Sequence, residues 1–228
     1  MNPPLLLLHG ALGSAAQFDP LLPLLPADFE VHTLNFPGHG GTPAAEPFSI
    51  GYFARFVLDF LDRKNIERVQ IFGYSMGGYT ALQLALLAPE RVVRVVTLGT
   101  KFGWTPEVAA RETTLLNADK IAAKVPLFAQ LLAERHAPGD WKSVLQQTAD
   151  LLHDLGNGSA LKLEDFAQIS CPVLIGLGAD DHMVGREESE NVAQALPQGR
   201  LDILPGVKHP FEQVDPDLLA HWLCQQFN

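Results

Sequence analysis

Cysteine is scarce in this sequence, which limits its redox chemistry and its capacity to bind metal. The 228 residues include only Cys171 and Cys224, and neither lies in a Cys-x-x-Cys or zinc-type spacing. Two isolated cysteines of this kind are typical of buried free thiols in a reducing compartment. We therefore expect a cytoplasmic protein, and no pattern in the sequence implies a bound metal or an organic cofactor.

Basic residues are also few. The chain has 16 lysine and arginine residues against 26 aspartate and glutamate residues, a formal net charge of −10. No compact group of basic residues offsets this excess, and an acidic surface repels the phosphate backbone of DNA and RNA. The charge balance argues against a nucleic-acid partner. It does not indicate an oligomeric state.

Long apolar segments are missing as well. The run Leu5–Leu8 near the N-terminus is far too short to span a bilayer. No lysine or arginine precedes it, as one would in a secretory signal. We expect neither a targeting segment nor a membrane partner.

The sequence does contain an alternation of short apolar runs with helical patterns, and it contains no internal repeat. Most of the runs are continuously hydrophobic, as are strands that are covered on both faces. Such alternation predicts right-handed βαβ units, and hence an α/β fold with a mostly parallel sheet of about six strands and helices on both faces. The runs are Pro4–Leu8, Val31–Leu34, Val69–Phe72, Val92–Leu98, Val173–Leu177 and Arg200–Leu204.

Helical patterns separate these runs. Ser49 is a candidate N-cap for a helix that extends to about Lys64. Residues 76–88 are rich in helix-forming side chains and end before Pro89. Residues 187–196 and 216–227 complete the pattern.

One segment, residues 101–165, contains no convincing strand. It shows helical patterns at 106–116, 126–136 and 141–155 instead. We expect residues 1–228 to form a single domain in which this segment is a helical cap, inserted between two strands and placed over one end of the sheet.

The motif Gly73-Tyr74-Ser75-Met76-Gly77 lies between a predicted strand and a predicted helix. In this setting a serine occupies a sharp, strained turn that lifts its hydroxyl group clear of the sheet. The two flanking glycines allow backbone to pass where a Cβ would collide. The N-terminus of the following helix favours negative charge beside the serine. The motif therefore predicts that Ser75 is a catalytic nucleophile.

Glycine-rich turns between a strand and a helix also occur in nucleotide-binding folds. A P-loop requires a lysine after the glycines, and none follows Gly78. The nearest match to a dinucleotide loop, Gly176-Leu177-Gly178, has Asp181 where the third glycine is required. The pattern favours catalysis over nucleotide binding.

Four further stretches accompany the serine motif, and with them the chain resembles the α/β-hydrolase family over essentially its whole length. In chain order they resemble the family's oxyanion loop, its Asp-x-Pro-Gly-His-Gly loop, the loop of the triad acid and the loop of the triad histidine. They are Leu8–Gly13, Asn35–Gly40, Gly178–Val184 and Gly206–Pro210. Two departures stand out. Asn35 replaces the usual aspartate, and only Met1–Pro4 precede the first strand, where the family usually has an antiparallel hairpin.

His209 is the predicted general base, because imidazole can take the Ser75 proton and return it to the leaving group. His182 is the main rival, but it adjoins the acid and cannot readily turn its ring between that carboxylate and Ser75. The other histidines have structural interpretations. His9 and His39 would support their loops, and His32 would lie in the core. His136 and His153 would face solvent from the cap, and His221 would belong to the last helix.

Asp181 is the predicted acid that orients His209. The resemblance implies this choice over Asp180, because Asp181 fits both Gly-x-x-Asp from Gly178 and Asp-x-x-Val to Val184. The backbone N–H groups of Ala11 and Met76 are the predicted oxyanion donors. The cluster of Asp180, Asp181 and His182 does not suggest a metal, since three consecutive residues rarely point at one ion.

The resemblance and the cap predict an esterase-like hydrolase that uses an acyl-enzyme. The cap offers apolar side chains and no cationic cluster, so we expect a small or medium, mainly apolar substrate. Two alternatives stay open: the same triad acting on a thioester, amide or carbon–carbon bond or in an elimination, and a binding protein that keeps the triad. The residues expected to line the pocket are Leu12, Tyr74, Phe102, Trp104 and Phe128.

Overall fold

Six strands form the centre of the protein, in a computed structural model that describes residues 3–227. They are β1 (Leu5–Leu8), β2 (Val31–Thr33), β3 (Val69–Tyr74), β4 (Val92–Leu98), β5 (Val173–Gly178) and β6 (Gly199–Leu204). Their order across the sheet is β2-β1-β3-β4-β5-β6, and each neighbouring pair is parallel. The predicted fold class is confirmed, and the described residues form no antiparallel pair.

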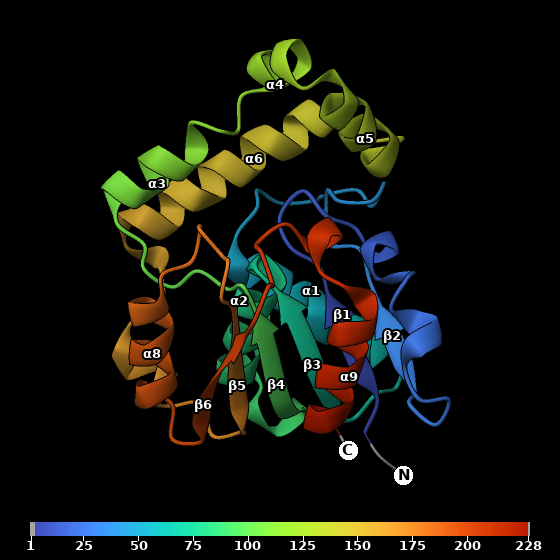
Figure 1. The fold of residues 1–228 in the computed structure, drawn as a ribbon, viewed down its shortest axis with the longest axis vertical. Coiled ribbons are helices and arrows are strands. Elements are labelled where there is room, and N and C mark those ends of the chain that lie inside the picture. The colour runs from blue at the N-terminus through green and yellow to red at the C-terminus, as the bar shows by residue number, and fades with distance from the viewer. Residues whose placement is uncertain (1–2, 228) are drawn as a thin grey trace.

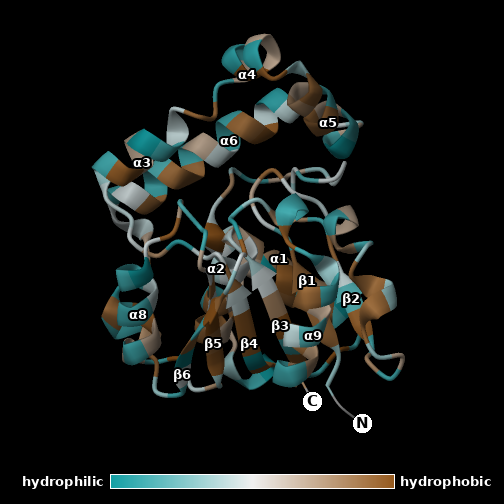
Figure 2. Ribbon diagram, in the orientation of Figure 1, coloured by the Kyte–Doolittle hydropathy of each residue, from teal (hydrophilic) through white to brown (hydrophobic). Residues whose placement is uncertain are grey.

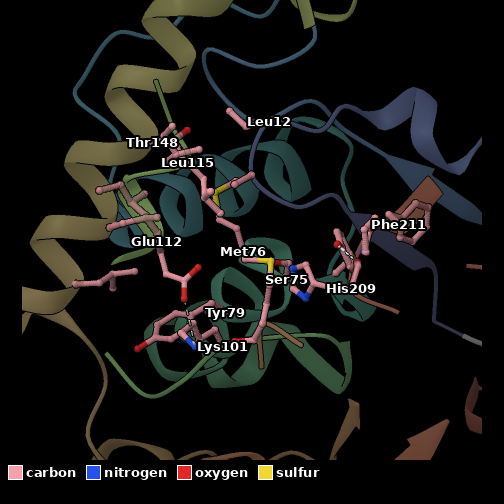
Figure 3. Close-up of a pocket in the computed structure, with 18 of the residues that line it drawn as sticks. Leu12, Ser75, Met76, Tyr79, Lys101, Glu112, Leu115, Thr148, His209 and Phe211 are labelled. Carbon is pink, nitrogen blue, oxygen red and sulfur yellow. Dashed lines mark hydrogen bonds and ion pairs between the residues drawn. The ribbon is translucent and has the colours of Figure 1, made fainter. Parts of the chain in front are cut away.

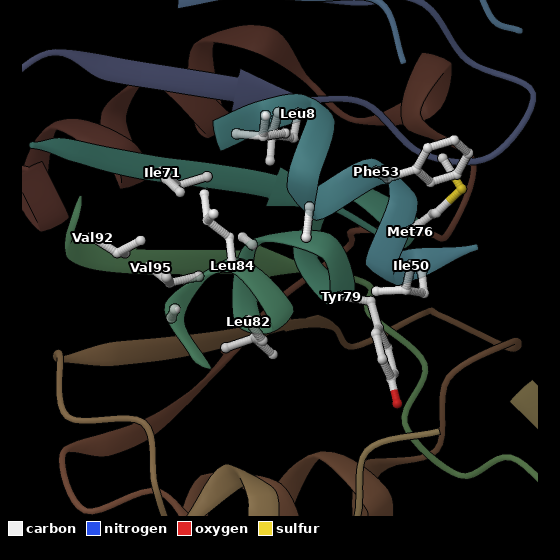
Figure 4. Close-up of a cluster of buried hydrophobic side chains, with 14 of the residues drawn as sticks. Leu8, Ile50, Phe53, Ile71, Met76, Tyr79, Leu82, Leu84, Val92 and Val95 are labelled. Atoms are coloured by element: carbon white, nitrogen blue, oxygen red, sulfur yellow. The ribbon is translucent and has the colours of Figure 1, made fainter. Parts of the chain in front are cut away.

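The continuous apolar runs are explained by two separate cores, one on each face of the sheet. Side chains of a strand alternate between faces. Leu6 and Leu8 of β1 accordingly belong to one buried cluster and Leu5 and Leu7 to the other. Figure 4 shows the first cluster, where side chains of β1, β3 and β4 pack against two of the helices that cover this face.

Helices cover both faces of the sheet (Figure 1). The clusters assign α1 (Ile50–Arg63), α2 (Met76–Leu87), α7 (Leu163–Phe166) and α8 (Arg186–Ala195) to one face. They assign α9 (Pro216–Phe227) and the 3₁₀ helix η1 (Ala15–Phe18) to the other, together with Leu21 and Leu25, which flank the 3₁₀ helix η2 (Leu22–Leu24). The Ser49 side chain accepts a hydrogen bond from the Tyr52 N–H, as expected of an N-cap. Short 3₁₀ helices at Pro89–Arg91 (η3) and Phe211–Gln213 (η5) complete the set.

The segment between β4 and β5 folds into helices that lie beyond the carboxyl ends of the strands (Figure 1). They are α3 (Pro106–Thr113), α4 (Ala118–Lys124), α5 (Pro126–His136) and α6 (Trp141–Asp154), followed by a π-helical turn at Leu155–Ser159 (η4). We call α3–α6 the cap helices. Figure 2 shows that they mix hydrophilic and hydrophobic residues, whereas the strands are hydrophobic. Within residues 3–227, no helix has the length and apolar character needed to cross a membrane.

Some local expectations were wrong. Helix α4 was not predicted, because seven residues capped by Asn117 carry too little apolar periodicity. His136 was expected to face solvent but is fully buried. His32 was expected in the core but is partly exposed and pairs with Glu30. Cys171 and Cys224 are free thiols, and both are half-buried.

Candidate active site

The parallel sheet brings the loops that follow β1, β3, β4, β5 and β6 to one edge, beneath the cap helices. Parallel strands all present their carboxyl ends at the same side, which is where open α/β sheets bind ligands. Ser75 directly follows β3, and Asp181 and His209 lie a few residues after β5 and β6. The sheet thus gathers residues that are far apart in the sequence.

Ser75 occupies a strained turn. Its backbone has φ 51° and ψ −116°, a combination that a non-glycine residue rarely adopts and that carries a strain of about 1–3 kcal/mol. The turn is possible because Gly77 lets α2 approach β1, and a Cβ on this glycine would overlap the carbonyl oxygen of Leu8. The turn places Ser75 at the N-terminus of α2 and on the wall of a cavity.

His209 and Asp181 are directly bonded. The Nδ1 atom of His209 lies 2.8 Å from Oδ2 of Asp181, and the two side chains are 13% and 1% exposed. The other carboxylate oxygen accepts the N–H groups of Met183 and Val184, at 2.8 and 3.0 Å. Burial raises the pKa of Asp181, but the His209 bond and these N–H groups outweigh burial and leave that pKa lowered.

The geometry distinguishes His209 from its rival. His209 lines the same cavity as Ser75, and Figure 3 shows its imidazole ring beside Ser75. His182 is exposed and does not line this cavity. Asp180 is likewise exposed, and only its backbone N–H makes a bond, to the Val207 carbonyl. The arrangement therefore joins a hydroxyl, an imidazole and a buried carboxylate at one place.

Tyr74 contacts the loop that carries His209 and helps to position it. Its hydroxyl group donates a hydrogen bond to the His209 carbonyl oxygen, and its ring packs against Phe211, with 4.9 Å between the centroids. Burial raises the pKa of Tyr74, so the phenol stays a donor. This predicted pocket residue thus lines the cavity and also positions a loop.

The residues that carry the predicted oxyanion donors lie at the cavity. Ala11 and Met76 both line it, and among residues 3–227 neither backbone N–H has a protein acceptor. Gly10 packs closely on the turn, because a Cβ there would lie 2.7 Å from the Tyr74 ring. Leu12 has a φ of 58°, and Nη1 of Arg135 donates to its carbonyl oxygen at 2.9 Å. A cap residue therefore holds the loop that carries Ala11.

Three buried histidines support this loop and its neighbour. Nε2 of His9 accepts the Phe36 N–H, Nδ1 of His39 donates to the Pro37 carbonyl, and Nδ1 of His136 accepts the Gly40 N–H. Burial lowers the pKa of His9 to about 3 and of His136 to about 4, so both rings are neutral near pH 7. His136, which was assigned to solvent, instead joins the cap to this group.

The hydrogen bonds of Asn35 explain why an amide stands where the family usually has an aspartate. Its Oδ1 accepts the Ala15 N–H at 2.7 Å, and its Nδ2 donates to the Gly40 carbonyl oxygen at 3.1 Å. An ionised aspartate is only an acceptor and could not make the second bond. The amide therefore ties the first loop to the second.

The cavity has a volume of about 370 Å³ and lies between the Ser75 turn and the cap helices. Leu12, Tyr74, Trp104 and Phe128 line it, as expected. Phe102 does not, because it is turned into the core, where its ring packs edge-on against Phe166. The apolar residues that the cap segment contributes to the cavity wall include Leu115, Leu116, Ile121, Leu151, Leu152 and Leu155.

Charged side chains also line this cavity, although no sequence pattern indicated them. Lys101 and Glu112 lie on one side, and Arg135 and Glu212 on another. Nη2 of Arg135 lies 2.8 Å from Oε1 of Glu212, which also accepts a hydrogen bond from Gln17. No helical or strand periodicity distinguishes such inward charges from solvated ones, so only the tertiary structure reveals them. The described part of the chain holds no group of three metal-ligating side chains.

Known proteins resemble the chain over nearly its full length. A family model described as the alpha/beta hydrolase fold matches residues 3–211. The chain belongs to the α/β-hydrolase family. Among relatives, RutD of Pseudomonas savastanoi pv. phaseolicola, named as a proposed carbamate hydrolase, is 30% identical over 93% of this chain and 89% of its own. The pimeloyl-[acyl-carrier protein] methyl ester esterase of Edwardsiella ictaluri is 29% identical over 97% and 92%.

Solved structures of the α/β-hydrolase family share the fold. The enol-lactonase of Burkholderia xenovorans superposes with a TM-score of 0.78 at 20% identity, over 99% of this chain and 91% of that one. The predicted family and fold are confirmed. The relatives place the chain among hydrolases, as the sequence indicated.

Proposed function

We propose that this hydrolase is a serine esterase that cleaves a small or medium, mainly apolar carboxylic ester through an acyl-enzyme. The observation that carries the proposal is the Asp181–His209 hydrogen bond beside the strained Ser75 turn, at the floor of the cavity. Residues 1–228 act as one domain in this proposal, and residues 101–165 form the cap that shapes the substrate site.

In the first half of the reaction, Ser75 Oγ attacks the ester carbonyl carbon while Nε2 of His209 takes the hydroxyl proton. Asp181 stabilises the imidazolium and holds its Nδ1–H. The oxyanion accepts hydrogen bonds from the backbone N–H groups of Ala11 and Met76, and each bond contributes about 3–4 kcal/mol of transition-state stabilisation. The alcohol then leaves with the His209 proton, and the acyl group remains on Ser75.

In the second half, water attacks the acyl carbon and His209 again takes the proton. The serine oxygen leaves, recovers a proton from His209, and the carboxylic acid is released. The two unpaired N–H groups and the helix N-terminus at Met76 support the same charge in both halves.

Two features favour an ester with an acyl group of modest size. The cavity holds about 370 Å³, near the lower end of the usual range for ligand pockets, and leucine and isoleucine side chains form much of its cap wall. One relative is named a methyl ester esterase, which supports an ester as the bond that is cleaved. A carbamate is the second candidate, because another relative is named for that bond and the same tetrahedral chemistry would cleave it.

Labelling and turnover together test the proposal. A fluorophosphonate probe should label Ser75, and peptide mapping should locate the label there. The protein should hydrolyse p-nitrophenyl acetate and butyrate, and Ser75→Ala should abolish both the label and the turnover. A folded protein that neither binds the probe nor hydrolyses these esters would contradict the proposal and favour a ligand-binding role. A panel of thioesters, amides and carbamates then ranks the bond types.

A further inference from the structure

A buried pair of opposite charges lies on the cap side of the cavity. The side chains of Lys101 and Glu112 are 11% and 9% exposed, and both line the cavity. Lys101 follows β4, and Glu112 belongs to α3. A charged group in an apolar cavity is unfavourable unless it has partners, so the partners of each side chain decide what it can bind.

Lys101 is already matched by acceptors. Its Nζ donates to the Met183 carbonyl oxygen at 2.7 Å and lies 3.6 Å from Oε1 of Glu188 and 4.0 Å from Oε1 of Glu112. An ammonium group has three N–H donors. One of these donors bonds to the Met183 carbonyl oxygen, and the two carboxylates lie at ion-pair distances. Two carboxylates beside one ammonium leave little attraction for an anionic substrate.

Glu112 keeps one oxygen free. Its Oε1 accepts a hydrogen bond from Arg111 at 2.9 Å and faces Lys101. Its Oε2 has no hydrogen-bond partner in the part of the chain that the structure describes. Figure 3 shows the Glu112 carboxylate in the space between Tyr79, Lys101 and Met76, on the side of the cavity opposite His209. The Glu112 side chain as a whole is nine-tenths buried, and Oε2 is the part of its carboxylate left to accept a hydrogen bond from a ligand or water in the cavity.

We propose that Oε2 of Glu112 binds a hydrogen-bond donor carried by the acyl group of the substrate. The preferred substrate is then an ester whose acyl chain is apolar in the middle and bears an ammonium or other N–H group further along. A chain that ends in a carboxylate is disfavoured, because it would meet Glu112 as a like charge. This inference rests on the proposed function, since the acyl chain must be attached to Ser75.

Three p-nitrophenyl esters with six-carbon acyl groups test the inference: hexanoate, 6-aminohexanoate and the half-ester of adipic acid. The unsubstituted hexanoate serves as the internal standard. In the wild-type protein, kcat/KM for the 6-aminohexanoate ester should exceed that for the adipate half-ester at least about tenfold, as a charged hydrogen bond predicts.

Two matched variants locate the cause. Glu112→Gln removes the charge on the cavity wall and should bring the two kcat/KM values within about threefold of one another. Glu188→Gln removes a charge from the same lysine without lining the cavity, and it should keep the wild-type ratio. Circular dichroism and denaturation establish that each variant is folded. If Glu112→Gln does not fold, the order of the three kcat/KM values in the wild-type protein decides whether the inference holds.

Three results would overturn the inference: a wild-type preference for the adipate half-ester, a ratio that Glu112→Gln leaves intact, or an equal loss of the ratio in both variants. If hexanoate itself is not hydrolysed, the proposed function fails instead. Calorimetric titration with hexanoate, 6-aminohexanoate and adipate then tests the subsite alone. Tightest binding of 6-aminohexanoate supports it, and tightest binding of adipate or hexanoate overturns it.

Discussion

Arg135 offers the sharpest test of how the cap controls the reaction. Its side chain is 10% exposed and makes two bonds, from Nη1 to the Leu12 carbonyl oxygen and from Nη2 to Glu212. Leu12 precedes Gly13 in the loop that presents Ala11, and its φ of 58° needs support from outside the loop. Replacing Arg135 by methionine, which is apolar and unbranched, removes both bonds.

The size of the effect follows from these bonds. A hydrogen bond from a charged donor to a buried carbonyl contributes about 1.5–3 kcal/mol. The pair with Glu212 adds less, because that carboxylate is 52% exposed and is screened by solvent. We expect Arg135→Met to lose about 2–3 kcal/mol of unfolding free energy. If the loss of these bonds weakens the hydrogen bond from the Ala11 N–H group to the oxyanion, kcat should fall about tenfold or more, with a smaller change in KM.

The assay measures kcat and KM for p-nitrophenyl butyrate, alongside urea denaturation. Glu212→Gln keeps the Leu12 bond and should leave kcat within about threefold of the wild type. Arg55→Met is the matched control, since it removes an exposed ion pair with Glu46 and should change neither quantity measurably. Millimolar guanidinium should partly restore kcat in Arg135→Ala. A folded Arg135→Met enzyme with wild-type kcat, or one altered only in KM, would refute the argument.

Three further predictions concern the turn and the acid. Gly77→Ala should destabilise the protein by about 3 kcal/mol or more in urea denaturation, because its Cβ would overlap the Leu8 backbone. Gly51→Ala should be neutral or stabilising, because its Cβ would make only an ordinary contact with the Arg55 side chain, and equal effects of the two changes would contradict this reasoning. Asp181→Asn should lower kcat by about 10⁴ without unfolding the protein, and a loss below tenfold would remove Asp181 from its proposed role. Since the folded-state pKa of Asp181 lies below its ordinary 3.8, its contribution to stability is complete well above that pH and is lost as pH falls through the folded-state pKa. The stability gap between wild type and Asp181→Asn, measured by denaturation, should therefore shrink on acidification below about pH 4 and not above it.

Much of the fold follows from local sequence. Strands covered on both faces carry apolar side chains at most positions, so all six runs were visible, and each became a strand within two residues of its predicted ends. Helices α5 and α9 begin and end where the sequence predicted, because proline starts each of them. Helix α4 was missed because its residues bury little apart from Ile121.

The candidate site likewise contains some residues that the sequence predicted and others that it did not. Ser75 could be found from the sequence because its turn imposes glycines at fixed spacing, and Asp181 and His209 because they stand in motifs at the ends of strands. The inward charge of Glu112 and the Arg135 bond to Leu12 have no such local signature. They depend on which way a cap helix turns over the sheet.

The sequence alone therefore determined the order of the strands and of most helices, the family, and the residues Ser75 and His209 at the floor of the cavity. Those features are set by steric and periodic rules that act within a few residues. Only the tertiary structure decided that Phe102 faces the core, that His136 is buried and that Glu112 lines the cavity. These outcomes depend on packing between the cap segment and the rest of the protein, where partners such as Leu12 and Arg135 are 123 residues apart and no local pattern records their contact.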